Sequence, residues 1–405
     1  MEKCFMRATK HFLLLGTLCA TSHLYAADLF TAQITVDGQT VPYQSYDKIL
    51  DLASQYTTKN LQQLIPSYNA NSGVTADIKY LGLTDIRLEF SPNSSTLKLN
   101  IPSANIYEEF SGSTRNESRS LMVDYLKTAP KEFNEALVGS SSEHPVNQAR
   151  VASTTATYEA NELATNIMAG ATPDQLSSVL SIAPRFGRYS QAGVDTDVIT
   201  LPLSYAKWLP NQNFMLVVDL PLTVTQSEKA IAGQASLGIG INSAVNENWY
   251  LMPQVRVGAT VSPDFGTSSS LWSTGLTSNY LFPVGESAHF NLINILSYYK
   301  TASLKIKDYN AKYDLNNVIY RNGLEYTQAL NTGIFNRSIV LKAHVARTDY
   351  TGDAVYSKYN HDVGFSIGFK NANAISFLQD LRIGVNYSKG DKDSEGLLVN
   401  AGYTF

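Results

Sequence analysis

The second half of the chain alternates between apolar and polar residues with a period of two, from Val179 to Phe405. Twelve segments carry this pattern: 179–188, 197–208, 213–225, 234–243, 249–261, 270–282, 288–300, 317–329, 337–349, 359–370, 380–388 and 396–405. Successive side chains of a β-strand point to opposite faces, so each segment predicts a strand with one apolar and one polar face.

A soluble β-sandwich also alternates, so the pattern alone leaves two classes open. The length of the segments favours a membrane barrel, because spanning strands need about 9–11 residues whereas soluble strands average about 5–6. The connections alternate between short turns and longer, more charged stretches, with 371–380 as an exception. Aromatic residues cluster at segment ends, as interfacial girdles require: Trp208, Trp249, Tyr250, Tyr280, Phe282, Tyr298, Tyr299 and Tyr403. We therefore expect a twelve-stranded antiparallel barrel over residues 177–405, located in the outer membrane.

The N-terminus has the pattern of a secretory signal peptide over residues 1–26. Three basic residues precede the apolar run FLLLGTLCA, and small residues precede a cleavage site after Ala26. Both cysteines, Cys4 and Cys19, lie in this segment. Lipidation at Cys19 is disfavoured by the bulky Leu18 before it. The mature chain is therefore expected to lack disulfides and thiolate metal sites.

The charge of the chain argues against a nucleic-acid partner. Removing residues 1–26 takes away three basic and one acidic side chain, which moves the formal charge from −4 to −6. The remaining chain is acidic and has no basic cluster.

Residues 27–144 are expected to form a small α+β domain. Asp37-Gly38 is a favoured hairpin turn between two β-rich runs. Ser45 is placed to cap a helix that continues to Ile65, and the segments 85–90 and 96–101 alternate like strands. Thr114 is placed to cap a second helix, which should end before Pro130.

Residues 145–176 join this domain to the barrel, and most of the segment predicts one long polar helix. Pro145 fits a first helical turn and Gly170 a C-terminal cap. A narrow alanine stripe recurs every four residues, at Ala152, Ala156, Ala160 and Ala164. Residues 148–169 would be about 33 Å long, close to the thickness of a bilayer's hydrocarbon core. A helix this polar needs wet or polar surroundings, so we expect either a helix inside the pore or a solvated linker.

Charged residues on the polar face of the strands should point into the barrel, because Arg or Lys facing mid-membrane lipid costs about 2–4 kcal/mol. The inward set comprises Arg185, Asp219, Arg256, Arg321, Glu325, Lys342 and Arg382. One hypothesis pairs the helix carboxylates Glu159 and Glu162 with lumen arginines. The alternative is that lumen charges pair across the wall. Inward glycines should leave room for the helix: Gly238, Gly240, Gly275, Gly323, Gly364, Gly368 and Gly384.

With its barrel, its preceding helix and its last strand ending AGYTF, the stretch 145–405 resembles an autotransporter β-domain, most closely the solitary autotransporter-like barrels. The resemblance implies that helix 148–169 occupies the pore. It also implies that Ala401, Tyr403 and Phe405 carry a signal for the barrel-assembly machinery and its periplasmic chaperones. Two features depart from that family. Residues 27–144 contain no β-solenoid repeat, and the helix has no Asn-Asn self-cleavage pair, since Asn161 and Asn166 are isolated.

The sequence predicts no enzyme, cofactor or metal site, because it contains no nucleophile elbow, phosphate-binding loop or zincin helix. His361-Asp362 loosely resembles the acid–histidine groups of omptin proteases, but a loop or lumen hydrogen bond explains it more simply. The leading expectation is a barrel that anchors its own N-terminal domain, either retaining it or also translocating it, among outer-membrane lipid and lipopolysaccharide. A small-solute channel and a surface adhesin are the alternatives.

Overall fold

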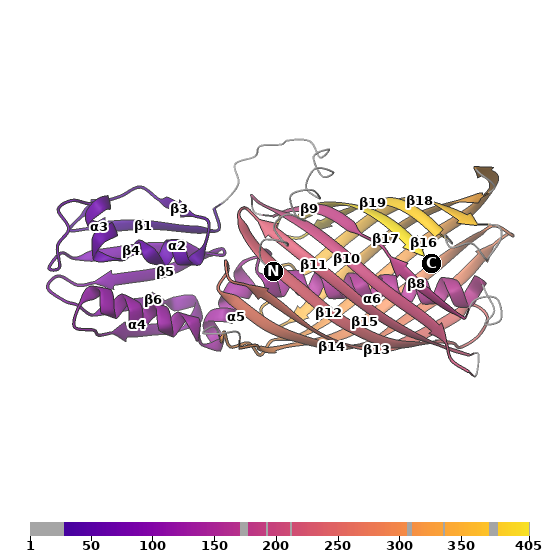
Figure 1. Ribbon diagram of the computed structural model, residues 1–405, viewed down its shortest axis with the longest axis horizontal. Coiled ribbons are helices and arrows are strands. Elements are labelled where there is room, and N and C mark those ends of the chain that lie inside the picture. Colours follow the sequence, from indigo (N-terminus) through magenta and orange to yellow (C-terminus); the bar gives the residue numbers. More distant parts are fainter. Residues whose placement is uncertain are drawn as a thin grey trace.

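The computed structural model describes residues 28–170, 177–191, 193–210, 213–305, 310–334, 337–371 and 380–404. This part of the chain forms a small α+β domain, a long helix and a β-barrel that surrounds the helix (Figure 1). The predicted fold class, mainly β with a closed antiparallel barrel, is confirmed. Ala26, at the predicted cleavage site, and Phe405 lie outside the described residues.

The barrel wall is built from strands that follow the chain in order. They are β8 (Ser178–Ile182), β9 (Arg185–Gln191), β10 (Val194–Trp208), β11 (Phe214–Ser227), β12 (Ala230–Ala244), β13 (Trp249–Ser262), β14 (Thr267–Val284), β15 (Ala288–Ser303), β16 (Asn316–Ile334), β17 (Arg337–Gly352), β18 (Tyr359–Asn371), β19 (Asp380–Gly390) and β20 (Glu395–Thr404). β8 and β9 are two halves of one spanning strand, because both pair with β10 and with β20. Counted this way, the described strands form a twelve-stranded barrel that β20 closes.

Two connections that the sequence predicts as long loops are shorter than expected. The stretches 189–196 and 226–233 are mostly strand, because β9 to β12 extend past the expected segment ends. Glu228 and Gly193 adopt positive φ angles of 52° and 82° in these turns. The strands therefore extend beyond the expected loop boundary at this end of the barrel.

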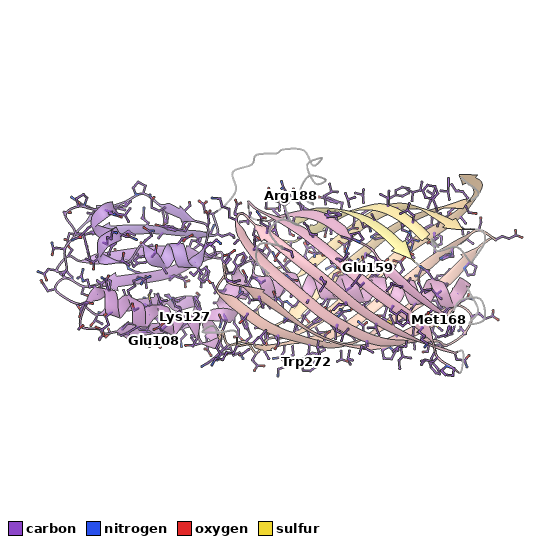
Figure 2. All side chains as sticks on the ribbon, in the orientation of Figure 1. Glu108, Lys127, Glu159, Met168, Arg188 and Trp272 are labelled. Atoms are coloured by element: carbon purple, nitrogen blue, oxygen red, sulfur yellow. The ribbon has the colours of Figure 1, made fainter. Side chains whose placement is uncertain are left out.

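The outer surface of the barrel is apolar. Large hydrophobic side chains alternate with inward polar ones and are exposed on every side of the wall, for example Val257 (60%), Phe365 (54%) and Ile383 (53%). Trp272 and Arg188 extend from the outside of the wall (Figure 2). A closed sheet satisfies its own backbone groups, and its apolar exterior matches lipid. The protein is thus an outer-membrane β-barrel. None of the helices in the described residues is both long enough and apolar enough to span a bilayer.

Aromatic side chains gather at two levels on this exterior. At one level Tyr280 contacts Phe282, with ring centroids 4.5 Å apart, and at the other Trp272 contacts Tyr298, with ring centroids 5.7 Å apart. Ten residues of β14 separate Trp272 from Phe282. For a strand tilted by about 40° that spacing is about 25 Å along the barrel axis, the height of a lipid-facing band.

The N-terminal domain is a sheet covered by helices on one face. Its strands are β1 (Phe30–Val36), β2 (Gln39–Thr40), β3 (Gln44–Tyr46), β4 (Val74–Tyr80), β5 (Leu83–Phe90), β6 (Leu97–Ile101) and β7 (Ile106–Phe110), in the order β2-β1-β4-β5-β6-β7 with β3 beside β1. Its helices are α2 (Ile49–Ser54), α3 (Thr58–Leu64), the 3₁₀ turn η2 (Pro102–Ala104), α4 (Arg115–Lys127) and α5 (Lys131–Ser140). α2 packs on β1 and β3, α4 on β6 and β7, and α5 on β5.

The predicted caps of this domain had mixed outcomes. Thr114 accepts a hydrogen bond from the Glu117 backbone N–H at 3.2 Å, as expected for the N-cap of α4. The prediction that Ser45 caps a helix was wrong, because Ser45 lies in β3, where its hydroxyl donates to Asp28. The expected single helix is two short ones, and Thr57 caps the second.

The domain of residues 28–144 docks on one end of the barrel, and we call it the cap domain. The hydroxyl of Tyr80 donates to the Phe265 carbonyl at 2.7 Å, and Lys48 forms an ion pair with Asp264 at 2.8 Å. Four barrel residues belong to the cap domain's own hydrophobic core: Val194, Ala230, Ala232 and Phe265. We call this the cap end of the barrel, and the opposite end, where β8 begins and β20 ends, the terminal end (Figure 1).

Candidate functional site: the lumen and its helix

Helix α6 (Pro145–Gly170) runs through the barrel from the cap end to the terminal end. Near its start, Gln148 accepts a hydrogen bond from Thr225 of β11 at 2.6 Å. Near its other end, Ile167 packs in a cluster with Val179 and Met215, which lie at the terminal ends of β8 and β11. Glu159 lies midway along the helix inside the wall, and Met168 near its far end (Figure 2). Of the two expected surroundings, the helix has the polar pore.

The helix lies against one side of the lumen, formed by β10 to β14. Ala156, Ala160 and Ala164 of the alanine stripe are buried there, and the last two pack with Ala206 and Met215. Ala152, the fourth member of the stripe, is only half-buried and borders a cavity. Small side chains allow the helix axis to approach the wall closely.

Polar side chains of α6 bond to the same wall. Thr157 accepts from Gln254 of β13 at 2.7 Å, and Thr165 accepts from Asn279 of β14 at 2.8 Å. Asn279 also donates to Asn161. The polar composition of the helix thus supplies hydrogen-bond partners for a polar wall, which explains how it stays buried.

The other side of the helix carries its carboxylates toward basic wall residues. Glu159 Oε1 lies 2.9 Å from Arg185 Nη1 of β9. Glu162 forms ion pairs with Lys342 of β17 and, at 3.2 Å, with Arg382 of β19. Three strands far apart in sequence are therefore tied to one turn of the helix.

The remaining lumen charges pair within the wall. Arg256 Nη2 lies 2.6 Å from Asp219 Oδ1, and Glu325 Oε1 lies 2.9 Å from Lys342 Nζ. Arg321 Nη1 lies 2.5 Å from Asp362 Oδ2. The two arrangements left open by the sequence, helix-to-wall pairs and pairs across the wall, are present together.

The inward glycines were expected to leave room for the helix, but they lie against neighbouring strands of the wall instead. A Cβ on Gly238 would meet the Asp219 carboxylate and Arg256, and one on Gly364 would meet the ring of His344. For all seven glycines the nearest atoms belong to neighbouring strands, not to α6. They therefore accommodate side chains and backbone of neighbouring strands in the wall, and the space for the helix comes from the diameter of the barrel.

A cavity of about 250 Å³ remains beside α6, between the helix and the wall formed by β9 to β11 and β16 to β20. It is lined by residues from Glu143 and Ser357, near the cap end, to Arg382 and Lys342 deeper in the lumen. This volume corresponds to about eight water molecules. Glu162, Lys342 and Arg382, which form the ion pairs between helix and wall, are among its lining residues.

The junction between the cap domain and α6 holds a buried acid and a buried histidine in adjacent positions. Glu143 accepts hydrogen bonds from Ser227 of β11 at 3.0 Å and from Gln148 at 3.2 Å, and burial raises its pKa to about 7. His144 Nδ1 accepts from the Val146 backbone N–H at 3.2 Å, and burial lowers the pKa of His144 to about 3. The first turn of α6 is therefore fixed by two groups whose charged forms burial disfavours.

Several residues that act here were absent from the expected set. Arg150 bonds to Asn317, Tyr158 Oη donates to Glu325 at 3.0 Å, and Asp362 pairs with Arg321. The alternation of Asp362 with inward Gly364 was a usable signal. His361 lies on the outer face against Tyr359, so His361 and Asp362 point to opposite sides and form no acid–base pair. Within the described ranges, no cluster of three or more His, Cys, Asp or Glu is arranged to hold a metal ion.

The predicted assembly-signal residues lie in the closing strand or beyond it. The Ala401 backbone N–H donates to the Pro184 carbonyl at 3.0 Å, and Tyr403 pairs through its backbone with Ile182 and Leu381. Phe405 follows the described part of β20.

No protein-family model and no curated protein matches the chain. Among solved structures, the β-domain of the Bordetella autotransporter BrkA is similar at 12% identity and a TM-score of 0.45, covering 56% of this chain and 99% of that one. The translocator domain of the autotransporter NalP from Neisseria meningitidis covers 62% of this chain and 97% of its own at 15% identity, with a TM-score of 0.43. LpxR from Salmonella typhimurium is similar at 10% identity and a TM-score of 0.38, with 56% and 99% covered. At these sequence identities and TM-scores, the similarities say nothing about the activity of this chain.

Proposed function

We propose that this protein is a non-enzymatic, autotransporter-like barrel that carries its own cap domain through the outer membrane and retains it on the cell surface. The observation that carries the proposal is the path of the chain. The cap domain lies at the barrel end opposite the barrel's termini, and α6 connects the two ends through the lumen.

Orientation supports the external position of the cap domain. Outer-membrane barrels with an even strand number keep both termini on the periplasmic side, from which they are inserted. The terminal end then faces the periplasm and the cap end faces outward. Assembly factors and chaperones of the periplasm would meet β20, with Ala401, Tyr403 and Phe405 as the proposed signal, and the outer rim would meet lipopolysaccharide.

Retention follows from the contacts at the cap end and in the lumen. Phe265 is 1% exposed and completes the cap domain's core, so the domain has barrel residues in its interior. The helix is tied to the wall by the ion pairs of Glu159 and Glu162. A released cap domain would expose the apolar surface around Phe265 to water, which costs free energy.

Cysteine labelling of intact cells tests the orientation, because both native cysteines precede Ala26. Tyr107→Cys lies on the cap domain, where Tyr107 is 63% exposed, and Glu286→Cys lies in the connection 284–288 at the terminal end. A membrane-impermeant maleimide should label Tyr107→Cys in intact cells and Glu286→Cys only after the outer membrane is permeabilised. The reverse pattern would place the cap domain in the periplasm and end the proposal.

The second candidate is a channel for small solutes, favoured by the cavity of about 250 Å³ beside the helix. In that case the purified protein should conduct steadily in planar bilayers without any substitution. The ion pairs that close around Glu162 lead us to expect a closed state instead.

A further inference from the structure

Backbone pairing is continuous in one part of the barrel wall. From the β13–β14 pair to the β19–β20 pair, the described registers run residue by residue, apart from a bulge between Leu330 and Gly333. A continuous ladder resists shear and widening because each residue pair would have to lose its hydrogen bonds.

The rest of the wall has three interruptions, each with a proline, although the β10–β11 ladder between them is continuous. Pro184 stands between β8 and β9. The β11–β12 register passes from Asp219–Gly238 to Leu222–Ala235 without pairing Pro221, and the β12–β13 register passes from Gly240–Gln254 to Ser243–Leu251 without pairing Pro253. Pro202, opposite Pro221 on β10, faces the break between β8 and β9.

Proline causes these gaps because it has no backbone N–H to donate. Ala183 donates to the Pro202 carbonyl at 3.3 Å, but the reciprocal bond to the Ala183 carbonyl cannot form. Ala401 of β20 donates to the Pro184 carbonyl at 3.0 Å, and again the reciprocal bond is lost. The seam that closes the barrel therefore belongs to the weakened part.

The helix lies over this same part of the wall. α6 contacts β10 to β13 and the adjacent β14. Thr157 accepts a hydrogen bond from Gln254 of β13, and Thr165 accepts one from Asn279 of β14. On the other side of the helix, β17 and β19 of the uninterrupted part carry Lys342 and Arg382, the ion-pair partners of Glu162. The cavity is lined from both parts of the wall, by β9 to β11 and by β16 to β20. The side of the barrel with fewer ladder bonds is thus the side that receives hydrogen bonds and close packing from the helix.

We propose that β8 to β13 form a compliant sector of the wall, which widens while residues 28–144 pass through the lumen and becomes rigid once α6 packs against it. The passage part of this inference rests on the proposed function. The finished lumen holds one helix, about 10–12 Å wide, so a wider passing segment requires the wall to yield. Yielding is easiest where ladder bonds are already absent.

Hydrogen exchange on the purified full chain tests the compliance itself. After correction for intrinsic rates, amides of β10 to β12 should exchange at least tenfold faster than amides of β15 to β17. Restoring donors with Pro202→Val and Pro221→Val should slow exchange in β10 to β12 by about tenfold. The matched control is Pro283→Val, because Pro283 pairs with His289 in an uninterrupted ladder near the terminal end. Equal exchange in the two sectors of the wild type overturns the proposal.

A second variant covers the case in which the valine substitutions prevent folding. Thr157→Ala with Asn161→Ala removes bonds from the helix to β13 and β14, and should raise exchange in β12 to β14 without affecting β17 or β18. No change, or an equal change around the whole wall, would show that the helix does not stiffen this sector.

The role in passage has a separate readout. In cells carrying Tyr107→Cys, the Pro202→Val and Pro221→Val variant should delay surface labelling of newly made protein severalfold. If amide exchange in this variant is slower but its surface labelling is as fast as in the wild type, the role in passage is overturned and the compliance of the wall still stands. If Tyr107→Cys is never labelled outside, the proposed function fails whatever the exchange rates are.

Discussion

Arg256 Nη2 lies 2.6 Å from Asp219 Oδ1 inside the barrel wall, where the arginine side chain is fully buried and that of the aspartate is 4% exposed. The pair crosses β12, and Gly238 is the residue of β12 directly between them in the register. The absence of a side chain at position 238 is what lets the two charged groups meet.

Gly238→Ala should therefore destabilise the barrel. The added Cβ would clash with the Asp219 carboxylate and lie 2.7 Å from Arg256 Nη2, and overpacking of this kind costs about 1–3 kcal/mol. The free energy of unfolding from urea titration in lipid vesicles measures the effect. Gly233→Ala on the same strand is the control, because its Cβ would have no heavy atom within 4 Å. Equal stability of the two variants would contradict this account.

Removing one member of the Arg256–Asp219 ion pair should lower the free energy of unfolding more than replacing both members by apolar residues. Arg256→Met leaves Asp219 buried without its partner, which costs about 3–5 kcal/mol. Asp219→Leu combined with Arg256→Met removes both charges and should recover most of that loss. The same urea titration gives the coupling energy of the double-mutant cycle, and additive effects of the two substitutions would argue against a direct interaction.

Glu162→Gln should loosen the helix on its charged side. The substitution removes the negative charge that Lys342 and Arg382 share, so the charge beside the cavity becomes more positive by one, and Lys342 keeps only its ion pair with Glu325. We expect single-channel recordings to show openings severalfold more frequent than in the wild type, with a preference for anions. Glu247→Gln, in the connection between β12 and β13 at the terminal end, is the control. Unchanged conductance together with unchanged amide exchange in α6 would argue that this ion pair does not hold the helix.

The junction before α6 should depend on pH in a way that reveals its two buried groups. Glu143 keeps a proton up to about pH 7 in the folded chain, whereas its ordinary pKa is 4.5, so its contribution to stability falls as pH rises from about 4.5 to 7. His144 stays neutral down to about pH 3 against an ordinary value of 6.5, so its contribution rises with pH from about 3 to 6.5. Asp195 raises the pKa of Glu143 further, and Arg150 lowers that of His144.

These opposite slopes cancel between about pH 4.5 and 6.5 in the wild type. Glu143→Gln removes one of them, so the junction of this variant should gain about 2–3 kcal/mol of stability across that range, at about 1.4 kcal/mol per pH unit. His144→Gln should instead lose stability as pH rises. Amide exchange in the first turn of α6, corrected for the intrinsic effect of pH, reports both. If the stability of this turn does not change with pH in Glu143→Gln, then His144 is not buried in its neutral form.

The architecture was readable in the sequence because its signals are local. Period-two alternation fixes which side chains of a strand face lipid, so each expected segment overlaps a strand of the barrel. The ends of α6 follow from Pro145, whose missing N–H is harmless in a first turn, and from Gly170, which tolerates a helix terminus. Ser45 was not predictable from local signals, because its hydroxyl bonds to Asp28, seventeen residues earlier, and not to a helix.

Which residues contact each other across the barrel was decided by the tertiary structure. Glu162 meets Lys342 and Arg382, about 180 and 220 residues along the chain, because closure of the barrel brings β17 and β19 beside one turn of α6. The off-centre position of the helix, the docking of the cap domain around Phe265, and the alignment of four prolines in one part of the wall likewise depend on which strands become neighbours. A repeating pattern determines which way a side chain faces, but a pairwise contact depends on register and closure, and those exist only once the whole wall has formed.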